Sequence, residues 1–292
     1  MRSGPYLLDR LRLAAISILP HHLLSHLVRV LTHSRVTFLK NLLIKGFLHL
    51  YTIDLTEAAQ PDPQRYESFN AFFTRALRDD ARPIASGNES ICSPVDGRIS
   101  QIGKIRSESI LQTKGHDYSL TALLGGDRAL ADNYMNGNFA TLYLAPRNYH
   151  RIHMPLAGKL KRTIYIPGRL YPVNVLAVRA LDRVFTRNER LVAVFDTAVG
   201  EMAVIMVGAL FVGFMETVWG TGREQQPGRR LQSIDYQGSG IRLEKAQEMG
   251  RFNMGSTVIL LFPAGRVAWV EELGEESPLR MGQELGRAAN AL

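Results

Sequence analysis

Residues 202–215 read MAVIMVGALFVGFM, fourteen residues without a charge. A helix that crosses the hydrocarbon core of a bilayer needs about 20 apolar residues, so this run is too short to span a membrane. It instead fits buried strands that are interrupted near Gly208 and Gly213. Similar short β-branched or aromatic runs, punctuated by Gly, Pro and Asn, occur at 139–145, 158–167, 190–195, 240–246 and 257–262. The sequence therefore predicts a mostly β body.

The first fifty residues show helical periodicity instead. Their longest uncharged run, 13–28, is interrupted by Pro20, is too short to cross a membrane, and lacks the cleavage pattern of a signal peptide. Lys40 and Lys45 are expected opposite the apolar stripe of the last helix. The three predicted amphipathic stripes are Leu7, Leu11, Ala14, Ala15 and Ile18; Leu23, Leu27, Val30 and Leu31; and Phe38, Leu39, Leu42, Leu43, Phe47 and Leu50.

A linker follows these helices, because the chain turns polar and reads Pro-Asp-Pro at 61–63. Next, the spacing of Phe69, Phe72, Phe73, Ala76 and Leu77 predicts a short helix that ends before Pro83. We therefore place a boundary at residue 60, between an N-terminal helical region (1–60) and the body (61–292).

The positive charge is concentrated in the N-terminal region. The chain has 35 Lys and Arg against 27 Asp and Glu, a net charge of +8. Residues 1–50 hold seven basic residues and one acidic residue, so they contribute +6 of this charge. A basic, leucine-rich segment favours an anionic membrane surface, with an attraction that weakens as salt is added. Packing of these helices on the body is the alternative, and nucleic acid is a less suitable partner.

Three stretches combine reactive side chains with turn residues. Asp96 lies in the turn SPVDG (93–97), His150 and His153 lie in PRNYHRIHMP (146–155), and Ser256 lies in MGRFNMGSTVI (249–259). Asp96, His153 and Ser256 allow a nucleophilic triad, although no Gly-x-Ser-x-Gly elbow is present. A His-x-x-His zinc site would need a third ligand, and a single cysteine, Cys92, allows neither a disulfide nor a thiolate cluster.

Taken together, these motifs resemble the pyruvoyl-dependent phosphatidylserine decarboxylases of the bacterial type. The resemblance covers about 69–263 in consistent order. It departs at Ala246, where Gly is expected, and at Met254, where Leu is usual. The motifs that carry it are 72–75 (FFTR), 82–84 (RPI), 93–97, 114–120 (KGHDYSL), 150–155, 167–168 (PG), 188–190 (NER), 248–252 (EMGRF) and 255–257 (GST).

The resemblance implies a cofactor made from the chain itself, a pyruvoyl group at position 256, and no metal. His153, oriented by Asp96, would deprotonate Ser256, whose oxygen attacks the carbonyl of Gly255. The resulting ester would eliminate to give a β chain (1–255) and an α chain (256–292), and the dehydroalanine at 256 would hydrolyse to pyruvoyl and ammonia. The substrate amine would then form a Schiff base at 256, and His150 would be the general acid that protonates the carbon after CO2 leaves.

The resemblance further implies phosphatidylethanolamine as product, a role in phospholipid biosynthesis, and a peripheral position on the cytoplasmic face of the cell membrane. The partners expected are phosphatidylserine, anionic lipid, the protein's own α and β chains and a homodimer of these. The fold expected is α+β, with N-terminal amphipathic helices before a mostly antiparallel β-sandwich or barrel-like catalytic body. The alternatives are a serine hydrolase with an unprocessed triad and a membrane-bound binding module without activity.

Overall fold

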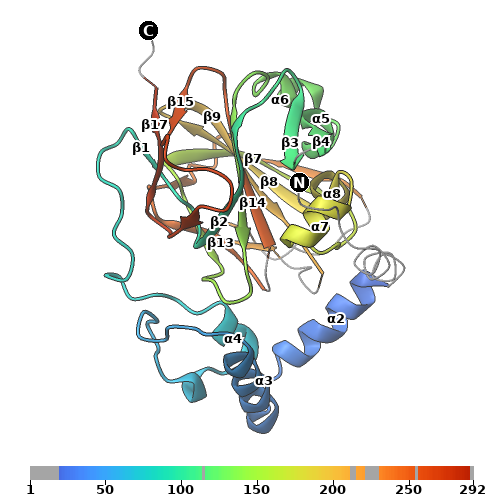
Figure 1. The fold of residues 1–292 in the computed structure, drawn as a ribbon, viewed down its shortest axis with the longest axis vertical. Coiled ribbons are helices and arrows are strands. Elements are labelled where there is room, and N and C mark those ends of the chain that lie inside the picture. The colour runs from blue at the N-terminus through green and yellow to red at the C-terminus, as the bar shows by residue number, and fades with distance from the viewer. Residues whose placement is uncertain (1–19, 114–115, 211–214, 221–229, 254–255, 290–292) are drawn as a thin grey trace, which may run out of the picture.

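The computed structural model describes residues 20–113, 116–210, 215–220, 230–253 and 256–289. It is an α+β fold, as predicted: helices come first, and a body of antiparallel sheets follows (Figure 1). The largest sheet has nine strands. In spatial order they are β11 (Gln232–Asp235), β7 (Gly158–Ile166), β8 (Arg190–Thr197), β9 (Gly200–Val207), β14 (Ser256–Phe262), β5 (Asn138–Leu144), β2 (Gly97–Lys104) and β16 (Pro278–Leu279), with β12 (Arg242–Leu243) also paired to β7.

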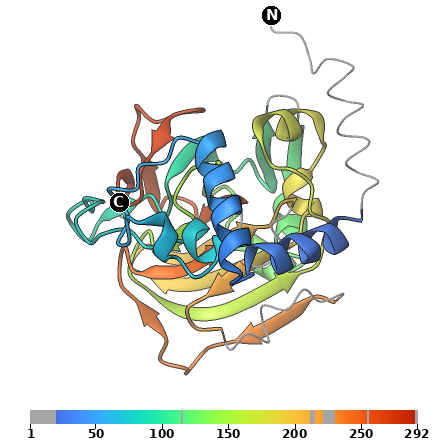
Figure 2. The same cartoon turned by 90° about the horizontal axis from the view of Figure 1, so that it is seen from below.

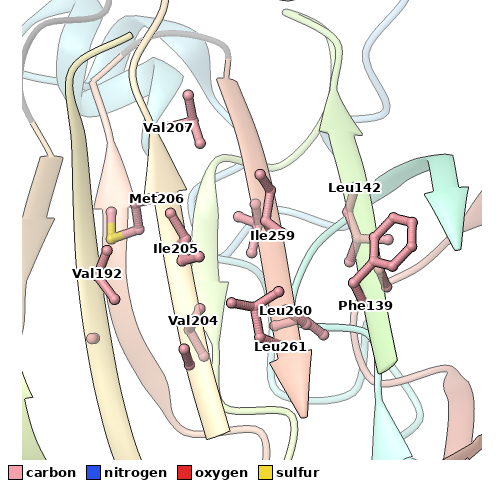
Figure 3. Close-up of a cluster of buried hydrophobic side chains, with 14 of the residues drawn as sticks. Phe139, Leu142, Val192, Val204, Ile205, Met206, Val207, Ile259, Leu260 and Leu261 are labelled. Carbon is pink, nitrogen blue, oxygen red and sulfur yellow. The ribbon is translucent and has the colours of Figure 1, made fainter. Parts of the chain in front are cut away.

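The four central strands of this sheet supply much of the main core. Every residue of β14 is buried, and the side chains of β8, β9, β14 and β5 meet in one apolar cluster (Figure 3). The uncharged run at 202–215 contributes most of β9, and its last residue begins β10 (Met215–Thr217). Gly213 lies outside the described residues. The prediction of buried strands in this run is thus confirmed for its first part.

Smaller sheets and helices surround the large sheet. The predicted strand at 240–246 is wrong beyond β12, because the backbone turns at 244–247, where the amide of Gln247 donates to the carbonyl of Glu244. The remaining strands are β1 (Ser90–Cys92), β17 (Glu284–Ala288) and β15 (Val267–Trp269) in one sheet; β10, β13 (Glu248–Phe252) and β6 (Arg151–His153) in a second; and β3 (Ser109–Thr113) with β4 (His116–Ser119) in a third. The short helices are α5 (Leu120–Leu123), α6 (Arg128–Asp132), α7 (Val175–Ala180) and α8 (Val184–Arg187).

Two longer helices, α2 (His21–Thr32) and α3 (Thr37–Leu50), match the second and third predicted stripes, whereas the first stripe lies outside the described residues. Seen from below, they cross one end of the body (Figure 2). One expectation for α3 is wrong. Lys40 does not lie on a solvated face, because its Nζ is buried and donates to the carbonyls of Gln64 (2.5 Å) and Tyr66 (2.6 Å). No helix in the described part of the chain is long and apolar enough to cross a membrane.

The apolar stripe of α2 faces outward. Its buried residues are polar (His21, Ser25 and Thr32), and His22 Nε2 donates to the carbonyl of Gly168 in the body. The four predicted stripe residues are about half exposed: Leu23, Leu27, Val30 and Leu31. Phe38 of α3 is 78% exposed. A helix that covers the core of a soluble protein buries its apolar side and exposes its polar side, whereas α2 does the opposite.

The predicted helix at 69–77 is shorter than expected. It forms α4 (Phe69–Phe73), which Ser68 caps by accepting a hydrogen bond from the amide of Ala71. It ends because the following residues pair with an earlier segment instead, through the bridge between Ala58 and Leu77. A short 3-10 helix, η1 (Pro63–Arg65), precedes it. The phenylalanines of α4 form a second core cluster with Ile44 of α3 and with Tyr66, which packs α3 against α4.

Candidate active site

The start of β14 lies beside the end of β5, and the start of β2 lies on the other side of β5. Ser256 pairs with Leu144, and on the other side of β5 the register of β2 places Gly97 next to Leu144. A Cβ at position 97 would collide with the carbonyl oxygen of Tyr143, so only glycine fits directly after Asp96. Because neighbouring strands lie about 4.8 Å apart, the backbones of Ser256 and Gly97 are roughly 10 Å apart.

Asp96 occupies the predicted turn between β1 and β2 and is held by a buried ion pair. Arg82 donates from Nε to Oδ1 (3.0 Å) and from Nη2 to Oδ2 (2.6 Å), and the amide of Met281 donates to Oδ1 (2.8 Å). Burial alone would lower the pKa of Arg82, but its hydrogen bonds to Asp96 and Glu57 raise that pKa above the ordinary value. The Asp96 carboxylate is therefore fixed in place by charge-assisted hydrogen bonds.

His153 is a neutral ring with a defined tautomer. Its Nδ1 lies 2.6 Å from the carbonyl oxygen of Ala246, and its Nε2 lies 2.9 Å from the hydroxyl of Tyr149. A carbonyl can only accept, so Nδ1 carries the proton and Nε2 accepts from Tyr149. Burial lowers the pKa of His153, although the bond to Ala246 opposes this. Nε2 therefore has the lone pair that a general base requires.

His150 is wholly buried against α4. Its ring stacks on Phe73, with 4.1 Å between ring centroids, and its Nε2 donates to the carbonyl of Pro146 (3.2 Å). Nδ1 is buried and has no hydrogen-bond partner among the described residues. Burial lowers the pKa of His150 to about 3. At neutral pH the ring is thus uncharged, with the unshared electron pair on Nδ1.

Ser256 is also completely buried, and its Oγ has no hydrogen-bond partner in the described part of the chain. Leaving a buried hydroxyl unpaired costs about 1–3 kcal/mol. Each such group in a native structure needs an explanation. Gly255, the other half of the predicted cleavage site, and Met254 lie outside the described residues.

The fold brings the predicted site residues to neighbouring elements. His153 in β6 is paired with β13, which leads along the chain to Ser256, and the amide of Phe252 donates to the carbonyl of His150. Burial lowers the pKa of both histidines, and the negative charge of Asp96 opposes this lowering only in part. However, both ring nitrogens of His153 have other partners, so the tautomer is set by Ala246. His116 lies apart in β4, with Nδ1 3.6 Å from Asp182 Oδ1.

Sequence reasoning missed three contributors to this site: Tyr149, Arg82 and the carbonyl of Ala246. Arg82 lies inside a motif that carried the resemblance and Tyr149 directly precedes another, so a signal was present without a role attached to it. Ala246 was noted only as a departure from glycine. The structure explains the expectation of glycine there, since Ala246 has φ = 63°, in the left-handed region.

No group of three or more potential metal-ligating side chains occurs among the described residues. Arg151, a basic residue of the histidine motif, is bound to Glu248 (2.7 Å) and to the carbonyl of Thr74 (2.9 Å). It is therefore a structural residue. Arg147, in the same motif, is exposed beside a cavity that Asp96 and Tyr149 also line.

Comparisons with known proteins show the family of the chain. A family model described as phosphatidylserine decarboxylase matches residues 69–287, and a model described as PSD matches residues 11–52. Curated relatives named phosphatidylserine decarboxylase proenzyme include one from Stutzerimonas stutzeri, 48% identical over 96% of this chain and 95% of its own. Others come from Pseudomonas aeruginosa (strain LESB58; 50% identical, 94% of this chain and 96% of the relative) and Bordetella avium (47% identical, 97% of both). The chain belongs to the phosphatidylserine decarboxylase family.

Proposed function

We propose that this chain is a proenzyme that cleaves itself between Gly255 and Ser256 and then decarboxylates phosphatidylserine to phosphatidylethanolamine. The observation that carries the proposal is the fully buried, unpaired hydroxyl of Ser256 at the start of β14. In an ordinary strand such a hydroxyl is a cost without a benefit. In a self-processing chain it is the nucleophile, kept away from water.

His153 is the base in this step. Its Nε2 takes the proton of Ser256, and the hydrogen bond from Tyr149 holds the ring until then. The carbonyl of Ala246 keeps the other proton on Nδ1. Asp96 acts through its negative charge, which stabilises the imidazolium that forms.

Ser256 Oγ then attacks the carbonyl carbon of Gly255, and elimination from the resulting ester releases the carboxyl end of 1–255. Hydrolysis at position 256 consumes one water and releases one ammonia.

Strand pairing should hold the two pieces together after cleavage. The piece 256–292 contributes β14, which lies between β5 and β9, and also β16 and β17, which pair with β2 and β1. All four of these partner strands precede residue 255. Separating the pieces would expose the core strand β14 to water. We therefore expect a stable complex of α and β chains.

The pyruvoyl group fits position 256, because the side chain from which it forms is buried and has no hydrogen-bond partner among the described residues. The strand before it in the chain, β13, pairs with β6, which carries His153. When present, this group supplies a carbonyl for the substrate amine and a sink for the electrons released with CO2. His150 provides the proton for the substrate carbon from Nδ1, its free ring nitrogen. The ring is neutral in the empty site, so protonation requires the negative charge that an anionic substrate brings.

The outward apolar face of α2 and α3 suits an enzyme whose substrate resides in a bilayer. Leu27, Val30 and Phe38 are exposed on it, and the basic residues Arg29 and Lys45 are also exposed. Apolar burial and attraction to anionic lipid act together on such helices. We propose a peripheral position on the cytoplasmic face of the cell membrane.

Intact-mass analysis of the purified protein tests this function. We expect two pieces, 1–255 and 256–292, with the smaller one blocked to amine sequencing, and release of CO2 from phosphatidylserine. Protein that remains a single chain with an unmodified Ser256, and that still turns over its lipid, would refute the proposal.

A further inference from the structure

Arg75 carries a buried guanidinium with free donors. The residue is 5% exposed, and its Nε and Nη1 are buried without a hydrogen-bond partner among the described residues. The guanidinium carbon lies 5.7 Å from the centre of the Phe72 ring. Arginine remains charged in proteins, and a buried charge without partners is strongly unfavourable. This arrangement is typical of a side chain that awaits an anionic ligand.

A cavity of about 550 Å³ gives such a ligand room. Arg75 lines it together with Arg147, Arg82, Asp96 and Tyr149. Arg82 is not available, because Asp96, Glu57 and the carbonyl of Ala81 already bind it. Arg147 is exposed, so it can complete a basic pair with Arg75 at the cavity.

The cavity adjoins the reacting groups and the helical arm. Tyr149, on its wall, binds His153, and Phe73, two residues before Arg75, stacks on His150. Thr52 and Ile53, which also line it, lie two and three residues after the end of α3. A lipid held at the outward face of α3 would therefore have this cavity next to its headgroup.

We propose that Arg75, assisted by Arg147, binds the phosphodiester of the substrate headgroup in this cavity. The inference rests on the proposed function, which supplies a headgroup with two anionic groups, a phosphodiester and a carboxylate. The phosphodiester is favoured because its charge persists through the reaction. A guanidinium paired with the carboxylate would lose its partner as neutral CO2 leaves, and would stabilise the substrate more than the transition state.

The charge of Arg75 also connects this site to His150. It is one of the influences that lower the pKa of that histidine. An anion bound to Arg75 offsets this charge and makes protonation of His150 easier. Occupation of the phosphodiester site would therefore prepare the proton donor.

The test compares Arg75→Gln and Arg75→Lys with a matched control, Arg78→Gln. Arg78 is three residues away and half exposed, and its guanidinium pairs with Asp80. Two soluble probes are used: dihexanoyl-phosphatidylserine, for KM and kcat, and dihexanoyl-phosphatidylethanolamine, which keeps the phosphodiester but lacks the carboxylate. We expect Arg75→Gln to lower the affinity for both lipids by the same factor, roughly ten- to a hundredfold. Arg75→Lys should lose less of this affinity, and Arg78→Gln should bind both lipids as the wild-type protein does.

Loss of affinity for the serine lipid alone would assign Arg75 to the carboxylate and overturn the proposal, as would unchanged affinity for both. Calorimetric binding of dihexanoyl-phosphatidylethanolamine needs no turnover, so its result stands even if wild-type protein proves inactive, which would count against the proposed function instead. If Arg75→Gln fails to fold, Arg147→Gln replaces it. A parallel loss for both lipids then supports the proposal, and no loss overturns it.

Discussion

His153 Nδ1 lies 2.6 Å from the carbonyl oxygen of Ala246, a residue whose φ is 63°. A left-handed backbone at this position turns the chain between β12 and β13 and provides the acceptor that fixes the histidine tautomer. The ring is thus oriented by a main-chain group, and the nearby aspartate contributes only its charge. This differs from a triad in which a carboxylate binds the second nitrogen.

Ala246→Gly should stabilise the protein. A left-handed conformation costs a non-glycine residue about 1–2 kcal/mol, and the extra freedom of glycine in the unfolded chain returns about 0.5–1 kcal/mol of this. We expect a net gain of about 0.5–1 kcal/mol in the free energy of unfolding, measured by urea denaturation in a Ser256→Ala background that stays a single chain. Ala268→Gly, at an exposed position in β15, should instead destabilise. Equal losses in both variants would contradict the role of backbone strain.

Substitutions of His150 and His153 should separate self-cleavage from decarboxylation. His150→Ala should still cleave itself, because Nε2 of His153 remains in place, but should lose most decarboxylation. His153→Ala should remain a single chain, since it lacks the proposed base. A denaturing gel and a CO2-release assay measure the two steps. A cleaved but inactive His153→Ala protein would reverse this division of roles.

Asp96→Asn should prevent self-cleavage and also destabilise the fold by about 3 kcal/mol, because it leaves the buried Arg82 without one of its partners. Glu57→Gln provides the control, since Glu57 binds the same guanidinium from a more exposed position. Glu57→Gln should weaken the interaction of residue 57 with Arg82, but the variant should still cleave itself. If both variants cleave at the wild-type rate, Asp96 has only a structural role.

Much of this site was predictable, and the rest was not, for a physical reason. Asp96, His150, His153 and Ser256 are side chains in short motifs, so the sequence identifies them. The carbonyl of Ala246 is a main-chain atom that any residue possesses, and only the fold brings it to His153. Arg75 was visible in its motif, but its burial was not.

The same distinction applies to the fold. Strand β14 was predicted because Val258, Ile259, Leu260 and Leu261 form an apolar run. The turn at 93–97 was expected between two strands, but the extent of β2 was not predicted, because its sequence, GRISQIGK, mixes charges and glycines with few apolar residues. It is stabilised by pairing with β5 and β16, which a local pattern does not reveal. Similarly, the stripe on α2 predicted a helix but not that its polar side would face the body.

Buried titratable groups predict opposing effects of pH on stability. His150 has a pKa of about 3 when folded and about 6.5 when unfolded, so between these values only the unfolded chain binds the proton. Its contribution is therefore lost as the pH falls, at up to about 1.4 kcal/mol per unit. Burial raises the pKa of Glu189 to about 7, so its contribution is lost as the pH rises from about 4.5 to 7.

The two effects oppose each other between pH 4.5 and 6.5, and His150 dominates below that range. In the Ser256→Ala background, His150→Gln should lose less stability than the parent on acidification from pH 4.5 to 3.5. Glu189→Gln should lose more than the parent between pH 6.5 and 4.5. Urea unfolding at these pH values measures both differences. Parallel curves for all three proteins would show that neither group remains in its buried state.

Acidic substitutions on the outward face of α2 and α3 should weaken membrane binding without unfolding the body. Leu27 and Phe38 are 52% and 78% exposed, so Leu27→Asp and Phe38→Asp disturb little internal packing. Each removes apolar surface worth about 1.5–3 kcal/mol if it enters the bilayer, and adds a charge of the wrong sign. We expect at least about tenfold weaker binding to phosphatidylserine-containing vesicles in a flotation assay.

Leu111→Asp is the control, because Leu111 is 41% exposed in β3, at the opposite end of the body from α3 (Figure 1). Since we propose that the helices bring the headgroup to the cavity beside Arg75, the arm variants should lose activity toward vesicles but keep it toward dihexanoyl-phosphatidylserine. Equal losses toward both substrates would mean that the arm acts on the catalytic site itself and not through the membrane.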